Sequence, residues 1–167
     1  MRKTTLALIT SILITTSISA QDTVSNKLLM NNENCTWQLK NATIPFTGVS
    51  CTYYRFGKIK RLVSFENGII EGRTITYYKN GKEKCEGECH NGELNGPSIW
   101  FDKQGNKTTI IYYQNHMKNG EQLWFNTVGN ITARGQWFND KKSGVWTVYD
   151  ESGTLVESIN YDTKDTE

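Results

Sequence analysis

The chain has 167 residues, of which 19 are Lys or Arg and 17 are Asp or Glu, and it contains 14 glycines but only two prolines. Aromatic residues make up 11% of the chain, and this composition is typical of many short strands joined by tight turns. It disfavours disorder. Once the two basic residues of the expected N-terminal leader are removed, positive and negative charges balance, so we expect no nucleic-acid partner.

The first 20 residues have the pattern of a secretory signal peptide. Arg2 and Lys3 precede an apolar stretch from Leu6 to Ile14, and small residues follow it as far as Ala20. The apolar stretch is too short to span a bilayer of about 30 Å. We therefore predict cleavage after Ala20 and a secreted or periplasmic protein. No later segment is apolar enough for a transmembrane helix, and no cysteine follows the cleavage site to carry a lipid.

From Gly48 to the C-terminus the chain repeats every 24 residues. Each row starts with a glycine and has a second glycine nine residues later: Gly48, Gly72, Gly96, Gly120 and Gly144, then Gly57, Gly81, Gly105, Gly129 and Gly153. A first aromatic column lies five residues after the leading glycine, at Tyr53, Tyr77, Phe101, Phe125 and Tyr149. A second column lies seventeen residues after it, at Phe65, Cys89, Tyr113, Trp137 and Tyr161. We predict five tandem repeats in residues 48–167.

Each row contains two extended runs, such as Arg73 to Tyr78 and Glu83 to Cys89, around a glycine-containing turn typical of a β-hairpin. A second turn links the rows, at Asn67-Gly68, Asn91-Gly92, Asn115-His116 and Asn139-Asp140. These residue types visit the left-handed backbone region most readily. Because one hairpin is only marginally stable, the rows should stack into an all-β fold, an elongated single antiparallel sheet.

Residues 21–47 lack the glycine pattern, and we interpret them as an N-terminal cap. The segment Thr36 to Lys40 around Trp37 is a candidate opening strand that covers the first edge of the sheet.

Period-2 alternation predicts one core face and one outer face. The core face would hold both aromatic columns together with Cys51, Ile75, Ile99, Leu123, Val63, Ile111 and Ile159. The outer face is polar in the first two rows and apolar later, which indicates a localised interaction patch. The predicted binding residues are Trp100, Trp124, Ile110, Tyr112, Phe138, Trp146 and Val148. Packing of this patch against the N-terminal segment or against a second copy of the chain is the competing interpretation.

The four cysteines, Cys35, Cys51, Cys85 and Cys89, are candidates for disulfides in an oxidising compartment, and all three pairings stay open. The segment from Cys85 to His90 has one residue too many for a haem-attachment motif, and on a strand His90 would point away from the two thiols. His90 and His116 lie at turns without a recurring catalytic partner. We therefore predict no metal site, no cofactor and no enzymatic activity.

The rows from Asn67 to Lys82 and from Gly144 to Tyr149 resemble the variant MORN repeats of bacterial YwqK-type proteins. The lead-in Ile44-Pro45-Phe46-Thr47-Gly48 resembles the usual entry into the first repeat, and the resemblance covers about residues 44–161. It implies an elongated single-layer sheet with no catalytic residue. Many such chains are labelled as antitoxin components by association.

The preferred hypothesis is a non-enzymatic secreted or periplasmic scaffold that binds another protein through the outer face. Binding of a toxin as an immunity factor is a special case of it. The alternative is a module that binds carbohydrate or membrane lipid, and a homo-oligomer stays open.

Overall fold

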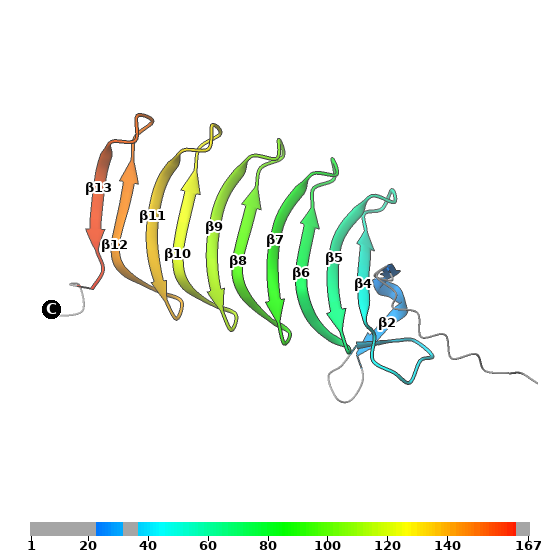
Figure 1. Cartoon of the computed structure of the whole chain (residues 1–167). Helices are drawn as coiled ribbons and strands as arrows, with labels where there is room; N and C mark the ends of the chain where they lie inside the picture. The colour runs from blue at the N-terminus through cyan, green and yellow to red at the C-terminus, as the bar shows by residue number, and fades with distance from the viewer. Residues whose placement is uncertain (1–22, 32–36, 163–167) are drawn as a thin grey trace, which may run out of the picture.

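The computed structural model describes residues 23–31 and 37–162, so the predicted signal peptide and Cys35 lie outside the described residues. The predicted all-β fold of stacked hairpins is confirmed. Ten strands lie side by side in chain order (Figure 1). They are β4 (Gly48–Tyr53), β5 (Ile59–Glu66), β6 (Ile69–Tyr77), β7 (Glu83–His90), β8 (Glu93–Phe101), β9 (Lys107–Gln114), β10 (Met117–Phe125), β11 (Ile131–Phe138), β12 (Lys141–Tyr149) and β13 (Leu155–Asn160).

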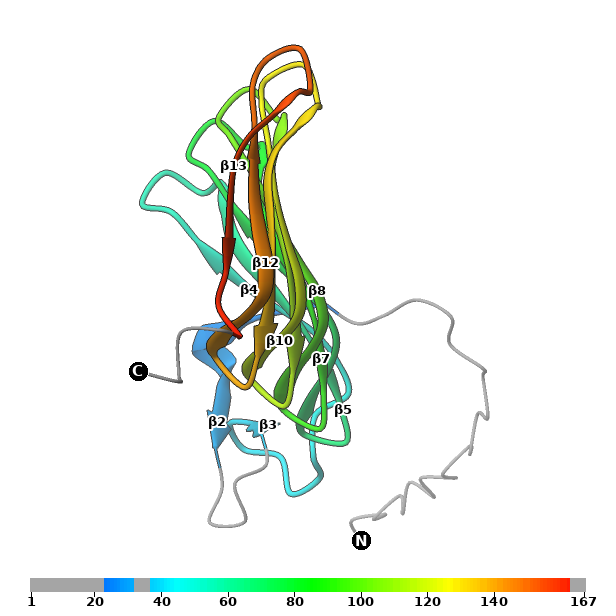
Figure 2. The ribbon, with the colours of Figure 1, turned by 90° about the vertical axis from the view of Figure 1, so that its left-hand side faces the viewer.

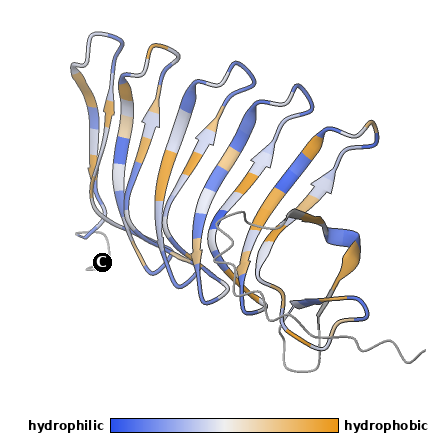
Figure 3. Ribbon diagram, turned by 45° about the vertical axis from the view of Figure 1, so that its right-hand side comes forward, coloured by the Kyte–Doolittle hydropathy of each residue, from blue (hydrophilic) through white to orange (hydrophobic). Residues whose placement is uncertain are grey.

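One further strand makes the sheet mixed rather than purely antiparallel. The short strand β1 (Thr23–Ser25) pairs parallel with β4, with Val24 beside Ser50. The resulting 11-stranded sheet does not close on itself, and no described layer covers its later repeats (Figure 2). Apolar and polar segments alternate along its strands (Figure 3), as expected for a sheet whose two faces differ.

The five hairpin tips share one backbone design along the upper edge of Figure 1. In the first tip the Tyr54 amide donates to the Lys58 carbonyl at 2.8 Å, and the Gly57 amide donates to the Tyr54 carbonyl at 3.0 Å. The same two bonds recur at each later tip, and the tip glycines all have φ between 84° and 93°. This left-handed conformation explains why glycine recurs there.

The turns between repeats run along the opposite edge and are left-handed at both central residues, as predicted. Asn139 and Asp140, for example, have φ of 48° and 63°. The second turn residue also bonds to the preceding repeat. The Gly92 amide donates to the Ile70 carbonyl at 2.8 Å, and the Asp140 amide donates to the Lys118 carbonyl at 3.0 Å. These turns therefore join neighbouring repeats as well as reversing the chain.

A one-residue bulge in every hairpin decides which side chains share a face. In the first hairpin Thr52 pairs with Arg61 but Tyr53 pairs with Ile59, so Lys60 is an extra residue. The same shift recurs in the other hairpins, with Lys84, Thr108, Thr132 and Val156 as the extra residues. Because side chains alternate along a strand, one inserted residue moves all the following side chains to the other face.

The prediction of a single core face is therefore wrong. Val63 pairs with Ser50 whereas Leu62 pairs with Cys51, so Cys51 and Val63 lie on opposite faces. We call the face of Ser50 and Val63 the cap face and the face of Cys51 the far face. The cap face holds the second aromatic column, and the far face holds the first column together with Ile75, Ile99 and Leu123.

The N-terminal cap packs on the cap face of the first repeat. It contains the 3-10 turn η1 (Asn26–Leu28) and a separate pair of strands, β2 (Leu29–Asn31) and β3 (Trp37–Leu39). Leu29 and Phe46 are buried against Val63 and Phe65, and the Phe46 and Phe65 rings lie 5.8 Å apart. These four residues form a buried hydrophobic core beneath the cap.

The strand around Trp37 lies over a face of the sheet and not along its edge, which corrects the sequence prediction. The Trp37 amide donates to the Gly68 carbonyl at 2.7 Å, and the Trp37 ring meets Phe65 edge-on at 6.1 Å. The edge of β4 is occupied instead by β1. Trp37 thus contributes apolar packing while β1 protects part of the exposed edge.

We predict that Gly129→Ala lowers the free energy of unfolding by about 1–2 kcal/mol, because a left-handed alanine is strained. Gly129 has φ +91°, and an added Cβ would meet nothing within 4 Å, so backbone strain is the whole cost. Urea unfolding followed by circular dichroism measures it. Thr127→Ala at the same exposed tip is the control, and equal loss in both variants would contradict the argument.

Candidate functional site

Aromatic side chains gather on the cap face at the C-terminal end of the sheet. Trp146 of β12 is at their centre. Its ring lies 5.7 Å from Trp124, 5.3 Å from Trp137 and 5.8 Å from Tyr161, with interplanar angles of 54°, 81° and 67°. Tilted and edge-to-face contacts of this kind add stabilisation beyond the buried area. We call these four residues the tryptophan cluster.

Two lysines lie over the rings of the tryptophan cluster. Lys118 Nζ is 4.2 Å from the centroid of Trp137, and Lys142 Nζ is 4.3 Å from that of Trp146. Lys142 also donates to the Tyr161 hydroxyl at 3.1 Å. The negative potential of the ring faces attracts these ammonium groups, so the cluster carries positive charge at its surface.

Hydrogen bonds fix the orientation of two indoles in the cluster. Trp137 Nε1 donates to Oε1 of the buried Gln122 at 2.7 Å. Trp146 Nε1 lies 3.1 Å from the Gln136 carbonyl and 3.2 Å from the Ser143 carbonyl, and both oxygens accept. Indoles held in this way need little reordering when a ligand arrives, which reduces the entropic cost of binding.

The close approach of Trp146 to the sheet depends on a glycine. A Cβ added at Gly135 would lie only 2.2 to 2.6 Å from three ring atoms of Trp146. Glycine inside a strand commonly marks such a close approach of another group to the backbone. Gly135 therefore allows the indole to lie directly against the main chain of β11.

A groove of about 450 Å³ opens beside the cluster. Its walls include Trp124, Trp146, Val148, Glu157 and Tyr161. Val148 is 42% exposed, and no described residue of the cap reaches this end of the sheet. The groove is largely apolar with a carboxylate and the Lys142 ammonium at its border, a composition suited to binding.

The structure divides the predicted binding residues between the two faces. Trp100, Trp124, Trp146 and Val148 lie on the cap face, whereas Ile110, Tyr112 and Phe138 lie on the far face. The assignment of all of them to one face is wrong because of the hairpin bulge. Binding by these residues stays a prediction. Sequence reasoning did not include Trp137, Tyr161, Lys118 and Lys142 in the site.

The cysteines of the described chain are not paired with one another. Cys51, Cys85 and Cys89 are free thiols, so the candidate disulfides among these three are not formed. Cys85 faces Ser98 with 3.5 Å between Sγ and Oγ, and Cys89 faces Thr74 at 3.6 Å. Burial raises the pKa of the Cys85 thiol, which favours its protonated form. No group of three or more potential metal ligands occurs among the described residues.

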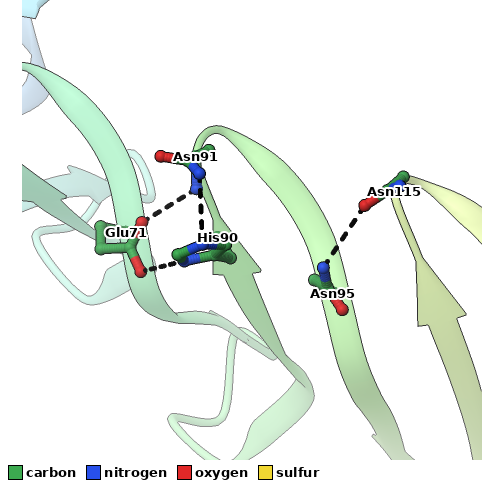
Figure 4. Close-up of polar contacts among 5 residues, drawn as sticks. All are labelled: Glu71, His90, Asn91, Asn95 and Asn115. Atoms are coloured by element: carbon green, nitrogen blue, oxygen red, sulfur yellow. Dashed lines mark hydrogen bonds and ion pairs between the residues drawn. The ribbon is translucent and has the colours of Figure 1, made fainter.

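His90 contacts the preceding repeat through Glu71 (Figure 4). Its Nδ1 lies 2.8 Å from Glu71 Oε1, and the other carboxylate oxygen accepts the Asn91 amide at 2.9 Å. The backbone hydrogen bond from Asn91 and the contact with His90 lower the pKa of Glu71. The hydrogen bond to Glu71 raises the pKa of His90. This ion pair is a structural contact between repeats, with no nucleophile beside it in the described chain.

Comparison with known proteins supports the repeat class. The family model described as MORN repeat variant matches residues 46–67 and 142–163, which begin 96 residues apart, four lengths of the 24-residue period. These segments correspond to the hairpins β4–β5 and β12–β13. The match to MORN repeats suggests a repeat scaffold for binding. The narrower resemblance to YwqK-type proteins stays a prediction.

Other comparisons add little. No curated protein matches the chain. A solved structure titled "Glycosylation Associate Protein (Gap123) complex from Streptococcus agalactiae" is similar over 82% of this chain, with 16% identity and a TM-score of 0.43. This chain covers 25% of that one. The described part of the chain contains no helix with the length and hydropathy needed to cross a membrane.

We predict that Gly135→Ala destabilises the protein by about 1–3 kcal/mol, because the added methyl group forces Trp146 away from the sheet. Gly87→Ala is the matched control, since Gly87 occupies the same position two repeats earlier. There the nearest atom is the flexible end of Leu94, at 2.9 Å. Thermal unfolding and near-ultraviolet circular dichroism should show the larger loss for Gly135→Ala. An equal loss in the two variants would argue against a packed Trp146.

We predict that Glu71→Gln lowers the pKa of His90, because the carboxylate that stabilises the imidazolium is lost. The pair stabilises the fold below the pKa that His90 has in the unfolded chain. Its contribution disappears as the pH rises through the raised pKa of the folded state. An NMR titration of the His90 ring protons measures the pKa, with Glu151→Gln at the far end of the sheet as a charge-matched control. An unchanged His90 pKa in Glu71→Gln would refute the pairing.

Proposed function

We propose that the protein is a non-enzymatic repeat scaffold that binds another protein through the C-terminal part of its cap face. The observation that carries the proposal is the tryptophan cluster, which is ordered by hydrogen bonds and lies beside an uncovered groove. The match to MORN repeat variant supports a binding scaffold in general.

The composition of the site favours a protein partner. Aromatic side chains are enriched at the centres of protein interfaces, and tryptophan often contributes most of the binding energy there. Trp100 is 39% exposed and lies on the same face two strands from Trp124, toward the middle of the sheet, with Thr109 between them. Because the cluster is held in place by Gln122 and by backbone carbonyls, a partner would meet a preformed surface.

Carbohydrate or membrane-lipid binding is the alternative function. Exposed aromatic rings can stack on sugars, but the rings of this cluster meet at 54° to 81° and do not form a row of parallel platforms. The angled rings suit irregular side chains of a protein better than the flat face of a sugar. The alternative therefore ranks second.

The proposed location is the periplasm or the extracellular space, supported by the signal-peptide pattern of the first 20 residues. A role as an immunity protein against a toxin is a special case of the proposed binding. Its support is the resemblance to YwqK-type proteins, and a partner identified by experiment would decide it.

The experiment is affinity capture from envelope and culture extracts, followed by binding measurements with the purified candidate. We expect Trp100→Ala/Trp124→Ala to weaken binding by tenfold or more, since losing an interface tryptophan typically costs about 2 kcal/mol or more. The matched control is Ile110→Ala/Tyr112→Ala, which removes apolar side chains from the far face of β9, the strand between β8 and β10. Circular dichroism verifies that both variants fold.

Two results with these variants would overturn the protein-binding proposal. One is unchanged affinity in the Trp100→Ala/Trp124→Ala variant, and the other is equal loss in the cap-face and far-face variants. Glycan arrays and liposome flotation test the alternative, and binding there without any protein partner would replace the proposal with it. Sedimentation of the purified protein tests a second copy as the occupant of the groove, and self-association that is lost in Trp100→Ala/Trp124→Ala would also contradict it.

A further inference from the structure

Formal charge changes steadily along the row of hairpin tips. The tip segment 54–61 has four basic residues and no acidic one, 78–85 has three and one, and 102–109 has two and one. Segment 126–133 has no charge, and segment 150–157 has three acidic residues and no basic one. Since the tips lie along one edge of the sheet (Figure 1), a nearly neutral chain carries a strongly basic end on this edge.

Three lysines of the basic end line one pocket. The pocket has a volume of about 490 Å³, and its walls are Tyr54, Tyr78, Lys79, Asn80, Lys84 and Lys103. These residues come from the tips of the first three hairpins, which the stacking of the repeats brings together. All three lysines are solvent-exposed, so a ligand can reach their ammonium groups directly.

Hydrogen bonds between neighbouring tips hold the walls of the pocket. The Tyr54 hydroxyl donates to the Tyr77 carbonyl at 2.7 Å, and the Tyr78 hydroxyl donates to the Phe101 carbonyl at 2.8 Å. Asn80 Nδ2 donates to the Lys103 carbonyl at 2.8 Å. These bonds each span about one repeat, so the positions of the three tips are coupled and the pocket is preformed.

The ammonium groups of the pocket have no carboxylate partner in the described chain. The ion pairs found in residues 23–31 and 37–162 involve Arg73, His90 and Arg134. Lys84 lies 5.9 Å from the Tyr78 ring centroid, whereas the neighbouring Lys82 is already bound to the Gln104 carbonyl. Three unpaired positive charges around one pocket favour an anion with several charges.

We infer that this pocket binds a phosphate group, either free or on a lipid headgroup. Lysine is a common ligand of phosphate because its compact charge and three donors accept many geometries. The two tyrosine rings form apolar walls on which the carbon skeleton attached to a phosphate can rest. The pocket lies on a different part of the molecule from the tryptophan cluster, so the inference is independent of the proposed function.

The experiment measures binding of inorganic phosphate by calorimetry and by NMR of the lysine ammonium region. We expect saturable binding to the wild type that weakens with added salt. Lys79→Gln/Lys84→Gln/Lys103→Gln should weaken it by about tenfold, as expected for removing three exposed charge contacts. The control Lys27→Gln/Lys40→Gln/Lys141→Gln removes the same net charge from exposed sites elsewhere and should bind as the wild type does.

A second arm distinguishes the source of the phosphate. Flotation with phosphatidylcholine vesicles, with and without phosphatidic acid, tests the lipid headgroup. Binding that requires phosphatidic acid and is lost only in the pocket variant supports the lipid source, and binding of inorganic phosphate alone supports a soluble ligand. Absence of binding to both probes, or equal weakening in the pocket and control variants, overturns the inference.

Discussion

The bulge that follows each hairpin tip controls how the two faces of the sheet are composed. It places one unpaired residue, such as Lys60 in the first hairpin, between the tip and the rest of the returning strand. As a result Val63 and Phe65 turn toward the cap, and Trp137 and Tyr161 turn toward Trp146. Both the N-terminal core and the C-terminal aromatic groove depend on this shift, because without it these side chains would project from the far face.

A single-layer sheet has no second layer to bury its side chains, so each repeat is stabilised by its neighbours. The two ends solve this problem differently. At the first repeat Leu29 and Phe46 cover Val63 and Phe65, whereas at the last repeat large aromatic rings and the stems of Lys118 and Lys142 pack on one another. The middle repeats rely on smaller buried contacts, such as Ser98, Gln122 and Ile111.

Local features of the sequence predicted the hairpins, because backbone demands at turns are visible in residue types. The glycine of each tip and the pair Asn139-Asp140 are examples. The division into faces could not be predicted, since it depends on a cross-strand register that period-2 alternation within one strand does not contain. The site was predicted only in part for the same reason. One feature of the sequence could have indicated that Trp146 packs against the sheet. Gly135, a glycine inside a strand, leaves room for a large side chain from the neighbouring strand.

The tips of the first two repeats differ from the later ones in how they satisfy their polar groups. Tyr54 and Tyr78 reach the backbone of the following repeat, whereas Asp102, Asn126 and Asp150 accept hydrogen bonds from amides of their own tip. A tyrosine tip is therefore bonded to its successor, whereas an aspartate or asparagine tip is bonded within itself. The repeats are not interchangeable modules. A gene that gained repeats by duplicating the self-contained kind could lengthen this ribbon at its C-terminal end without leaving a hydroxyl unpaired.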